Sequence, residues 1–164
     1  MTPEFLRPLT LDRIGPEGVE ITVTAEPAER AALALRMHLP AIQSLTCRFH
    51  LRPGPAGGVH ATGRLQARIT QTCIVSTDDF PAEIAEDFAV RFVPTGTEEE
   101  DPDIDSPDEI PFAGTALDLG EAAAEQLALA LDPYPRKPGA ILDSDAAAAP
   151  ENPFARLAGL RRDT

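Results

Sequence analysis

The sequence predicts an α+β domain in which two helices pack on the apolar face of a curved, mostly antiparallel β-sheet beside an acidic flexible loop. Segments in which apolar and polar residues alternate predict the strands of the sheet. Two segments that begin with residues typical of helix N-termini predict the helices. We expect one domain over residues 1–139. The Ala/Pro-rich remainder, 140–164, reads as a tail whose one patterned segment, 154–160, is a candidate short helix.

The first elements are a strand and a helix. Residues 19–24 read Val-Glu-Ile-Thr-Val-Thr, which predicts a half-buried strand. Pro27 stands where the first turn of a helix tolerates proline, so a helix is expected from there to about Met37, and Pro40 ends it.

Two long alternating segments, 44–52 and 59–75, follow, and a Pro/Gly-rich turn at 53–58 joins them as a hairpin. One side of each segment is apolar, and the other is polar. Because successive side chains of a strand point to opposite faces, pairing the apolar sides gathers four arginines on one surface. These four are Arg48, Arg52, Arg64 and Arg68.

The rest of the domain holds one more strand and one more helix. Residues 84–93 alternate as a strand, and the Pro-interrupted acidic run at 96–110 is expected to be a mobile loop. Asp118 and Glu121 resemble a capping box, which predicts a helix that runs to Leu131.

Charge is segregated along the chain. Residues 30–77 hold six arginines and all three histidines but no Asp or Glu, although the chain has 27 carboxylates and a net charge of -13. A field of one sign steers partners of the other, so the four gathered arginines indicate a phosphate-binding surface. The alternative is an ordinary solvated face of the sheet.

Composition narrows the function classes. The net charge of -13 argues against non-specific binding of the whole protein to nucleic acid or to anionic membranes. Only 5% of residues are aromatic, with no Trp, which argues against a broad base-stacking platform. We expect no secretory signal and no membrane-spanning helix, and we read Cys47 and Cys73 as reduced thiols of a cytoplasmic protein.

The sequence offers no set of residues typical of an active site. Cys47 and His50 fall on opposite faces of their strand, which argues against a nucleophile pair. An apparent calcium loop that starts at Asp101 fails at its sixth and twelfth positions, Ser106 and Phe112. We therefore expect a protein that is not an enzyme and has no cofactor, no metal and no small-molecule substrate.

Two further segments have alternative interpretations. Arg136 and Lys137, in the Pro-rich basic turn after the second helix, are either cations at a helix end or a second phosphate contact. The acidic loop is either solvated, a cover for the arginines, or a docking site for a basic protein. The residues of such a docking site would be Glu98, Glu99, Glu100, Asp101 and Asp103.

Three segments resemble the YceD family, also called DUF177: DLGEAAAEQLALAL at 118–131 with the basic turn after it, NPFARL at 152–157, and QTCIVSTDDFP at 71–81. The similarity covers roughly 19–160 and includes the order of the elements. The resemblance implies a role in the accumulation of large-subunit (23S) ribosomal RNA, through ribosome assembly or rRNA processing in bacteria and chloroplasts.

The chain departs from the family pattern at two places. Many members have C-x-R-C where this chain has Cys73 and Ser76, and many have further cysteines after the basic turn, where Gly139 and Ala140 stand here. The zinc site that the resemblance implies for those members is therefore not expected in this chain.

These observations lead to one hypothesis and two alternatives. The protein is expected to bind precursor large-subunit rRNA or a pre-ribosomal particle through the four arginines, with Arg136 and Lys137 as a second cluster. One alternative is an acidic adaptor or chaperone for a basic ribosomal protein. The other is a nuclease or modifying enzyme, which would need a metal or an acid/base pair.

Overall fold

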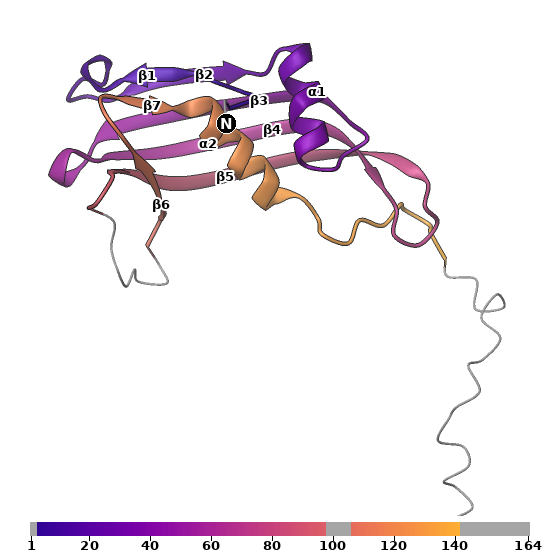
Figure 1. Ribbon diagram of the computed structural model, residues 1–164. Coiled ribbons are helices and arrows are strands. Elements are labelled where there is room, and N and C mark those ends of the chain that lie inside the picture. Colours follow the sequence, from indigo (N-terminus) through magenta and orange to yellow (C-terminus); the bar gives the residue numbers. More distant parts are fainter. Residues whose placement is uncertain (1–2, 98–105, 142–164) are drawn as a thin grey trace, which may run out of the picture.

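A computed structural model describes residues 3–97 and 106–141 (Figure 1). These residues form a five-stranded sheet in the order β2-β3-β4-β5-β6 and a two-stranded sheet, β1-β7. Both helices lie on one side of the large sheet (Figure 1). The predicted α+β class, with two helices and a mostly antiparallel sheet, is confirmed.

The elements follow the expected order, with three short strands that the sequence pattern did not reveal. Neighbours in both sheets are antiparallel, except that β6 runs parallel to β5. The bounds are β1 Pro8–Thr10, β2 Val19–Thr24, α1 Pro27–Arg36, β3 Ala41–Pro53, β4 Val59–Thr72, β5 Asp79–Pro94, β6 Asp108–Phe112, β7 Ala116–Asp118 and α2 Leu119–Ala130.

The predicted acidic loop, 96–110, extends three residues too far at its C-terminal end. Asp108, Glu109 and Ile110 belong to β6, because the chain returns there beside the last residues of β5. Residues 98–105 and the tail from 142 onward lie outside the described part. Within that part, neither helix has the length and apolar character needed to cross a bilayer.

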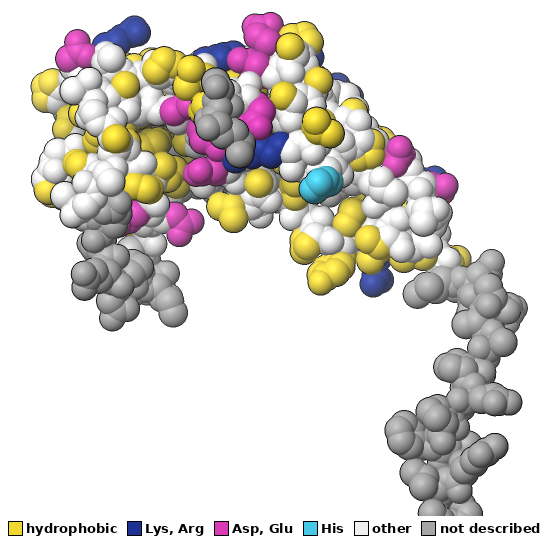
Figure 2. Space-filling view, in the orientation of Figure 1, with side chains coloured by type: hydrophobic (Ala, Val, Ile, Leu, Met, Phe, Trp, Pro, Cys, Tyr) yellow, Lys and Arg dark blue, Asp and Glu magenta, His cyan; other side chains and the backbone are white. Residues whose placement is uncertain are grey.

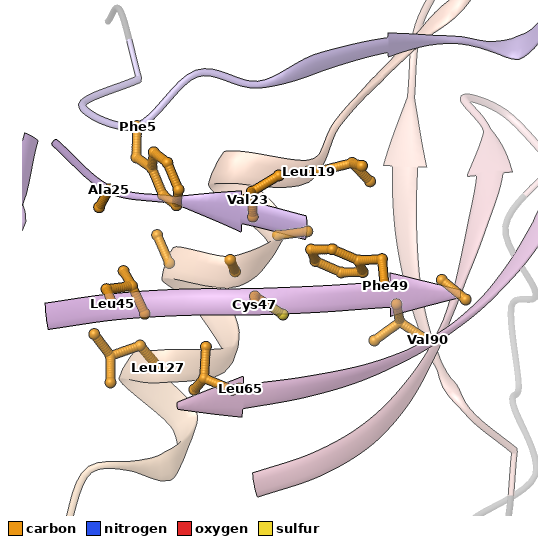
Figure 3. Close-up of a cluster of buried hydrophobic side chains, with 14 of the residues drawn as sticks. Phe5, Val23, Ala25, Leu45, Cys47, Phe49, Leu65, Val90, Leu119 and Leu127 are labelled. Atoms are coloured by element: carbon orange, nitrogen blue, oxygen red, sulfur yellow. The ribbon is translucent and has the colours of Figure 1, made fainter. Parts of the chain in front are cut away.

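The strands bury one face and expose the other, as their alternation predicts. Leu45, Cys47, Phe49 and Leu65 are fully buried on the face toward the helices, which we call the inner face. Figure 3 shows these side chains between the strands and α2, whose Leu119 and Leu127 complete the layer. The opposite side of β2–β5 is the outer face, and no described helix covers it.

Backbone hydrogen bonds fix the start of α2 against the N-terminal segment. The Asp118 carboxylate accepts hydrogen bonds from the backbone N–H groups of Gly120, Glu121 and Arg7. The reciprocal half of the predicted capping box is wrong, because the Glu121 carboxylate binds Arg36 of α1 instead of the N-cap backbone. The same contact joins the two helices.

Candidate nucleic-acid interface

The four predicted arginines lie together on the outer face along β3 and β4. Arg48 stands directly opposite Arg64 in the antiparallel register, Arg52 stands opposite His60, and Arg68 stands opposite Ser44. Each arginine is exposed because its strand neighbours occupy the buried parity. We call Arg48, Arg52, Arg64 and Arg68 the arginine strip.

The strip has a regular spacing. Side chains on one face of a strand recur about every 6.8 Å, so the three cationic levels of the strip are separated by about 14 Å. Neutral residues fill the levels between them: His50 pairs with Thr62, and Thr46 pairs with Gln66. Charged forks therefore alternate with smaller hydrogen-bonding groups along the strip.

Carboxylates from β2 and β5 border the strip on both sides. The arginine Nε atoms lie 3.9 Å from Glu20 for Arg48, 3.8 Å from Asp87 for Arg64 and 3.6 Å from Glu83 for Arg68. These distances exceed hydrogen-bonding range, and the side chains are 62–81% exposed. Each such pair is worth only about 0–1 kcal/mol, so an incoming anion can displace it.

These flanking carboxylates, Glu20, Glu83 and Asp87, are the part of the site that the sequence pattern alone does not predict. Residues 30–77 contain no acid, so this stretch of sequence does not reveal the carboxylates that neighbouring strands bring beside the arginines. Glu20 does sit on a polar position of its alternating segment, and so do Glu83 and Asp87. That signal becomes informative only when the strand register is known.

The outer face is hollowed along the strip. One open hollow of about 530 Å³ lies among Glu20, Arg48, His50, Thr62, Arg64 and Asp87. A second, of about 370 Å³, lies among Ser44, Thr46, Gln66, Arg68 and Glu83. Both hollows are lined by arginines, hydroxyl groups and carboxylates, with apolar residues such as Phe88 in the first and Ile84 in the second. The guanidinium and hydroxyl groups can bind the phosphate oxygens of an extended chain.

The other predicted cations, Arg136 and Lys137, do not join the strip. Their turn binds the hairpin tip between β4 and β5, where the Ile74 N–H donates to the Pro135 carbonyl at 2.9 Å. The Lys137 ammonium lies 3.2 Å from the Asp78 carboxylate. This second cluster stands at the end of β4, beyond Arg68, and part of its charge is already paired.

The two cysteines occupy contrasting environments, and both are free thiols. The Cys73 sulfur accepts backbone N–H groups of Val75, Ser76 and Lys137 at 3.3–3.4 Å. The Ser76 hydroxyl and these N–H groups lower the pKa of Cys73 to about 7, whereas burial raises the pKa of Cys47 to about 12. Cys73 thus fastens the basic turn to the hairpin tip.

The predicted partner-binding carboxylates, Glu98 to Asp103, lie outside the described residues. At the end of their loop, Glu109 forms an ion pair with Arg91. Over residues 3–97 and 106–141, no group of three or more His, Cys, Asp or Glu side chains is arranged to hold a metal ion.

Among the described residues, the helix-bearing side has no comparable cationic surface. Figure 2 shows Lys and Arg side chains scattered singly there among Asp and Glu. Arg36 on this side pairs with Glu4 and Glu121 at 3.1 and 2.7 Å, which makes it a link between elements. The arginine strip is therefore the best candidate for an anionic partner.

Comparison with known proteins gives one match. The family model described as "Large ribosomal RNA subunit accumulation protein YceD" matches residues 61–161, which is more than half of the chain. The match includes Arg64 and Arg68 of β4 and the basic turn, but it begins after β3. No curated protein and no solved structure matches the chain.

Proposed function

Because the chain belongs to the YceD family, we propose that it supports the accumulation of large-subunit ribosomal RNA as a non-enzymatic binding factor. Its partner would be precursor rRNA or a pre-ribosomal particle. The family description supplies the process, and the arginine strip supplies a surface on which RNA can bind.

The observation that carries this proposal is the alignment of four exposed arginines along β3 and β4. A guanidinium fork matches two phosphate oxygens, and a hydrogen bond to a charged group is worth about 1.5–3 kcal/mol. The present ion pairs with the flanking carboxylates are longer than hydrogen bonds and exposed. Phosphates can therefore replace carboxylates on the strip.

The same surface favours contacts to the RNA backbone over reading of its sequence. None of the described residues at outward-facing positions of β2–β5 is Phe, Tyr or Trp. Phe88 borders the first hollow, but its ring packs edge-on against Phe49 of the inner face, so this face has no row of aromatic rings of the kind typical of base recognition. The net charge of -13 opposes loose binding elsewhere on the protein. Arg136 and Lys137 would add a contact at the end of β4.

The test is the salt dependence of binding to fragments of large-subunit rRNA. If the strip and the basic turn neutralise about four to six phosphates, the log–log plot of the binding constant against salt should have a slope of roughly -3 to -5. A variant with all four strip arginines changed to Gln should lose most of this binding and slope while it keeps its far-ultraviolet circular dichroism. Salt-insensitive binding would overturn the model.

A matched pair of single variants controls for charge. Arg64→Gln removes a strip arginine, and Arg13→Gln removes the same charge from an exposed turn after β1. We expect only the first to weaken RNA binding clearly. The RNA should also remain intact after incubation with Mg²⁺, since cleavage would indicate the nuclease alternative.

One observation favours the adaptor alternative: the outer face carries carboxylates on β2 and β5 beside the arginines of β3 and β4, so it is not uniformly basic. A basic ribosomal protein could be held by these carboxylates together with the acidic loop. Deletion of residues 98–105 separates the two functions. An adaptor loses its protein partner, whereas an RNA-binding factor keeps its RNA.

A further inference from the structure

We infer that the outer face accepts one single strand of RNA, laid along β3 and β4 between the flanking carboxylates, and that these carboxylates exclude a duplex. The inference rests on the proposed RNA-binding function and specifies the class of RNA. It assigns Glu20, Glu83 and Asp87 a role in the choice between single-stranded and duplex RNA. Their weak ion pairs contribute little to the stability of the fold.

The charges follow a fixed order across the sheet. From β2 to β5 the outer face presents Glu20, then Arg48, then Arg64, then Asp87. Glu20 stands diagonal to Arg48, opposite His50, and Asp87 stands directly opposite Arg64, with Nε–carboxylate distances of 3.9 and 3.8 Å. Further along, Glu83 borders Arg68 in the same way. The carboxylates are 64–81% exposed, so they meet the same ligand that the arginines meet.

The dimensions of this arrangement suit one phosphate backbone. Neighbouring strands are about 4.8 Å apart, so the arginine strip on β3 and β4 is narrow, and the backbones of β2 and β5, which carry the carboxylates, are about 14 Å apart. The two backbones of an RNA duplex face each other across a wide minor groove. If one backbone lies on the strip, the other comes near a carboxylate, within the Debye length of about 8 Å at physiological salt.

The levels between the arginines suit unpaired nucleotides. His50, Thr62, Thr46 and Gln66 offer hydrogen-bonding groups between the charged levels, and the two hollows of about 530 and 370 Å³ lie at these positions. Unpaired bases can enter such hollows and stack on guanidinium planes, whereas paired bases remain within the helix. The neutral levels therefore favour a single strand for a second, independent reason.

The experiment compares an oligouridine of about twelve nucleotides with a blunt oligouridine–oligoadenosine duplex of the same length, by fluorescence anisotropy at several salt concentrations. The test variant combines Glu20→Gln, Glu83→Gln and Asp87→Asn. The control variant combines Asp12→Asn, Glu86→Gln and Glu125→Gln, which changes the net charge equally. Glu86 is an especially close control, because it lies in β5 opposite Leu65, at the inner-face parity.

The wild-type protein should bind the single strand at least about tenfold more tightly than the duplex. The test variant should bind both RNAs more tightly. Its affinity for the duplex should rise more than its affinity for the single strand, so the preference for the single strand should fall below about threefold. The control variant should keep the wild-type preference. An unchanged preference in the test variant would overturn this inference but leave RNA binding intact. If neither RNA binds the wild type or the test variant, the proposed function itself is wrong.

Discussion

The inner and outer faces of the sheet are made by the same strands, yet different rules determine them. On the inner face of β3 and β4, side chains are buried because of their position within their own strand, as Leu65 and Phe49 show. On the outer face, the charge beside each arginine depends on which strand becomes its neighbour. Arg64 meets Asp87 only because β4 and β5 pair in one particular register. Periodicity thus decides burial, whereas register decides charge balance.

The largest effect should come from breaking the inner face. Leu65→Ala leaves a cavity at a fully buried position, so the free energy of unfolding should fall by about 2–5 kcal/mol. Gln66→Ala, the next residue on the outer face, should change it by less than about 0.5 kcal/mol. Urea titrations of the two variants measure this difference. Equal losses in the free energy of unfolding would contradict the expectation that the inner face contributes most of the stability.

The next effect concerns a glycine at a crowded point of the inner face. Gly63 lies between Phe49 and Phe88 in the register, and a Cβ placed on it would come within 2.2 Å of the Phe88 ring. We therefore expect Gly63→Ala to lower the free energy of unfolding by about 1–3 kcal/mol. The same substitution in a Phe88→Ala background should cost less, and a double-mutant cycle measures that coupling. Independent, additive effects would contradict the crowding.

The sequence predicts these inner positions well and the outer partners poorly. Alternation located β2 to the residue and placed Cys47 and His50 on opposite faces, because a strand's own pattern specifies both. It did not reveal β6 or β7, which are short and are specified by the strands they pair with, β5 and β1, more than by their own patterns. The positions of the four arginines could be predicted because they depend on the pattern of their own strands. Their carboxylate partners could not, because they depend on which strands pair and in which register.

The two cysteine thiols differ in pKa because their surroundings differ. Cys73 has a pKa of about 7 because the Ser76 hydroxyl and backbone N–H groups stabilise its thiolate, and that value lies below the pKa of about 8.5 of an unfolded cysteine. Its stabilising contribution is therefore present above about pH 8.5 and is lost as the pH falls through 7. Thiolate absorbance should show this transition near pH 7 in the Cys47→Ala variant. The Cys73→Ala variant should lack it, since Cys47 titrates only near 12.

The smallest effect should come from the flanking carboxylates, and its smallness is informative. Glu83→Gln and Asp87→Asn each remove one partner of an exposed, long ion pair, so the free energy of unfolding should change by less than about 0.5 kcal/mol. Chemical denaturation at low and moderate salt provides the measurement. A loss above about 1 kcal/mol would show that these carboxylates serve the fold. If stability is unchanged while RNA selectivity shifts, the charge order on the outer face serves binding, because stability does not require it.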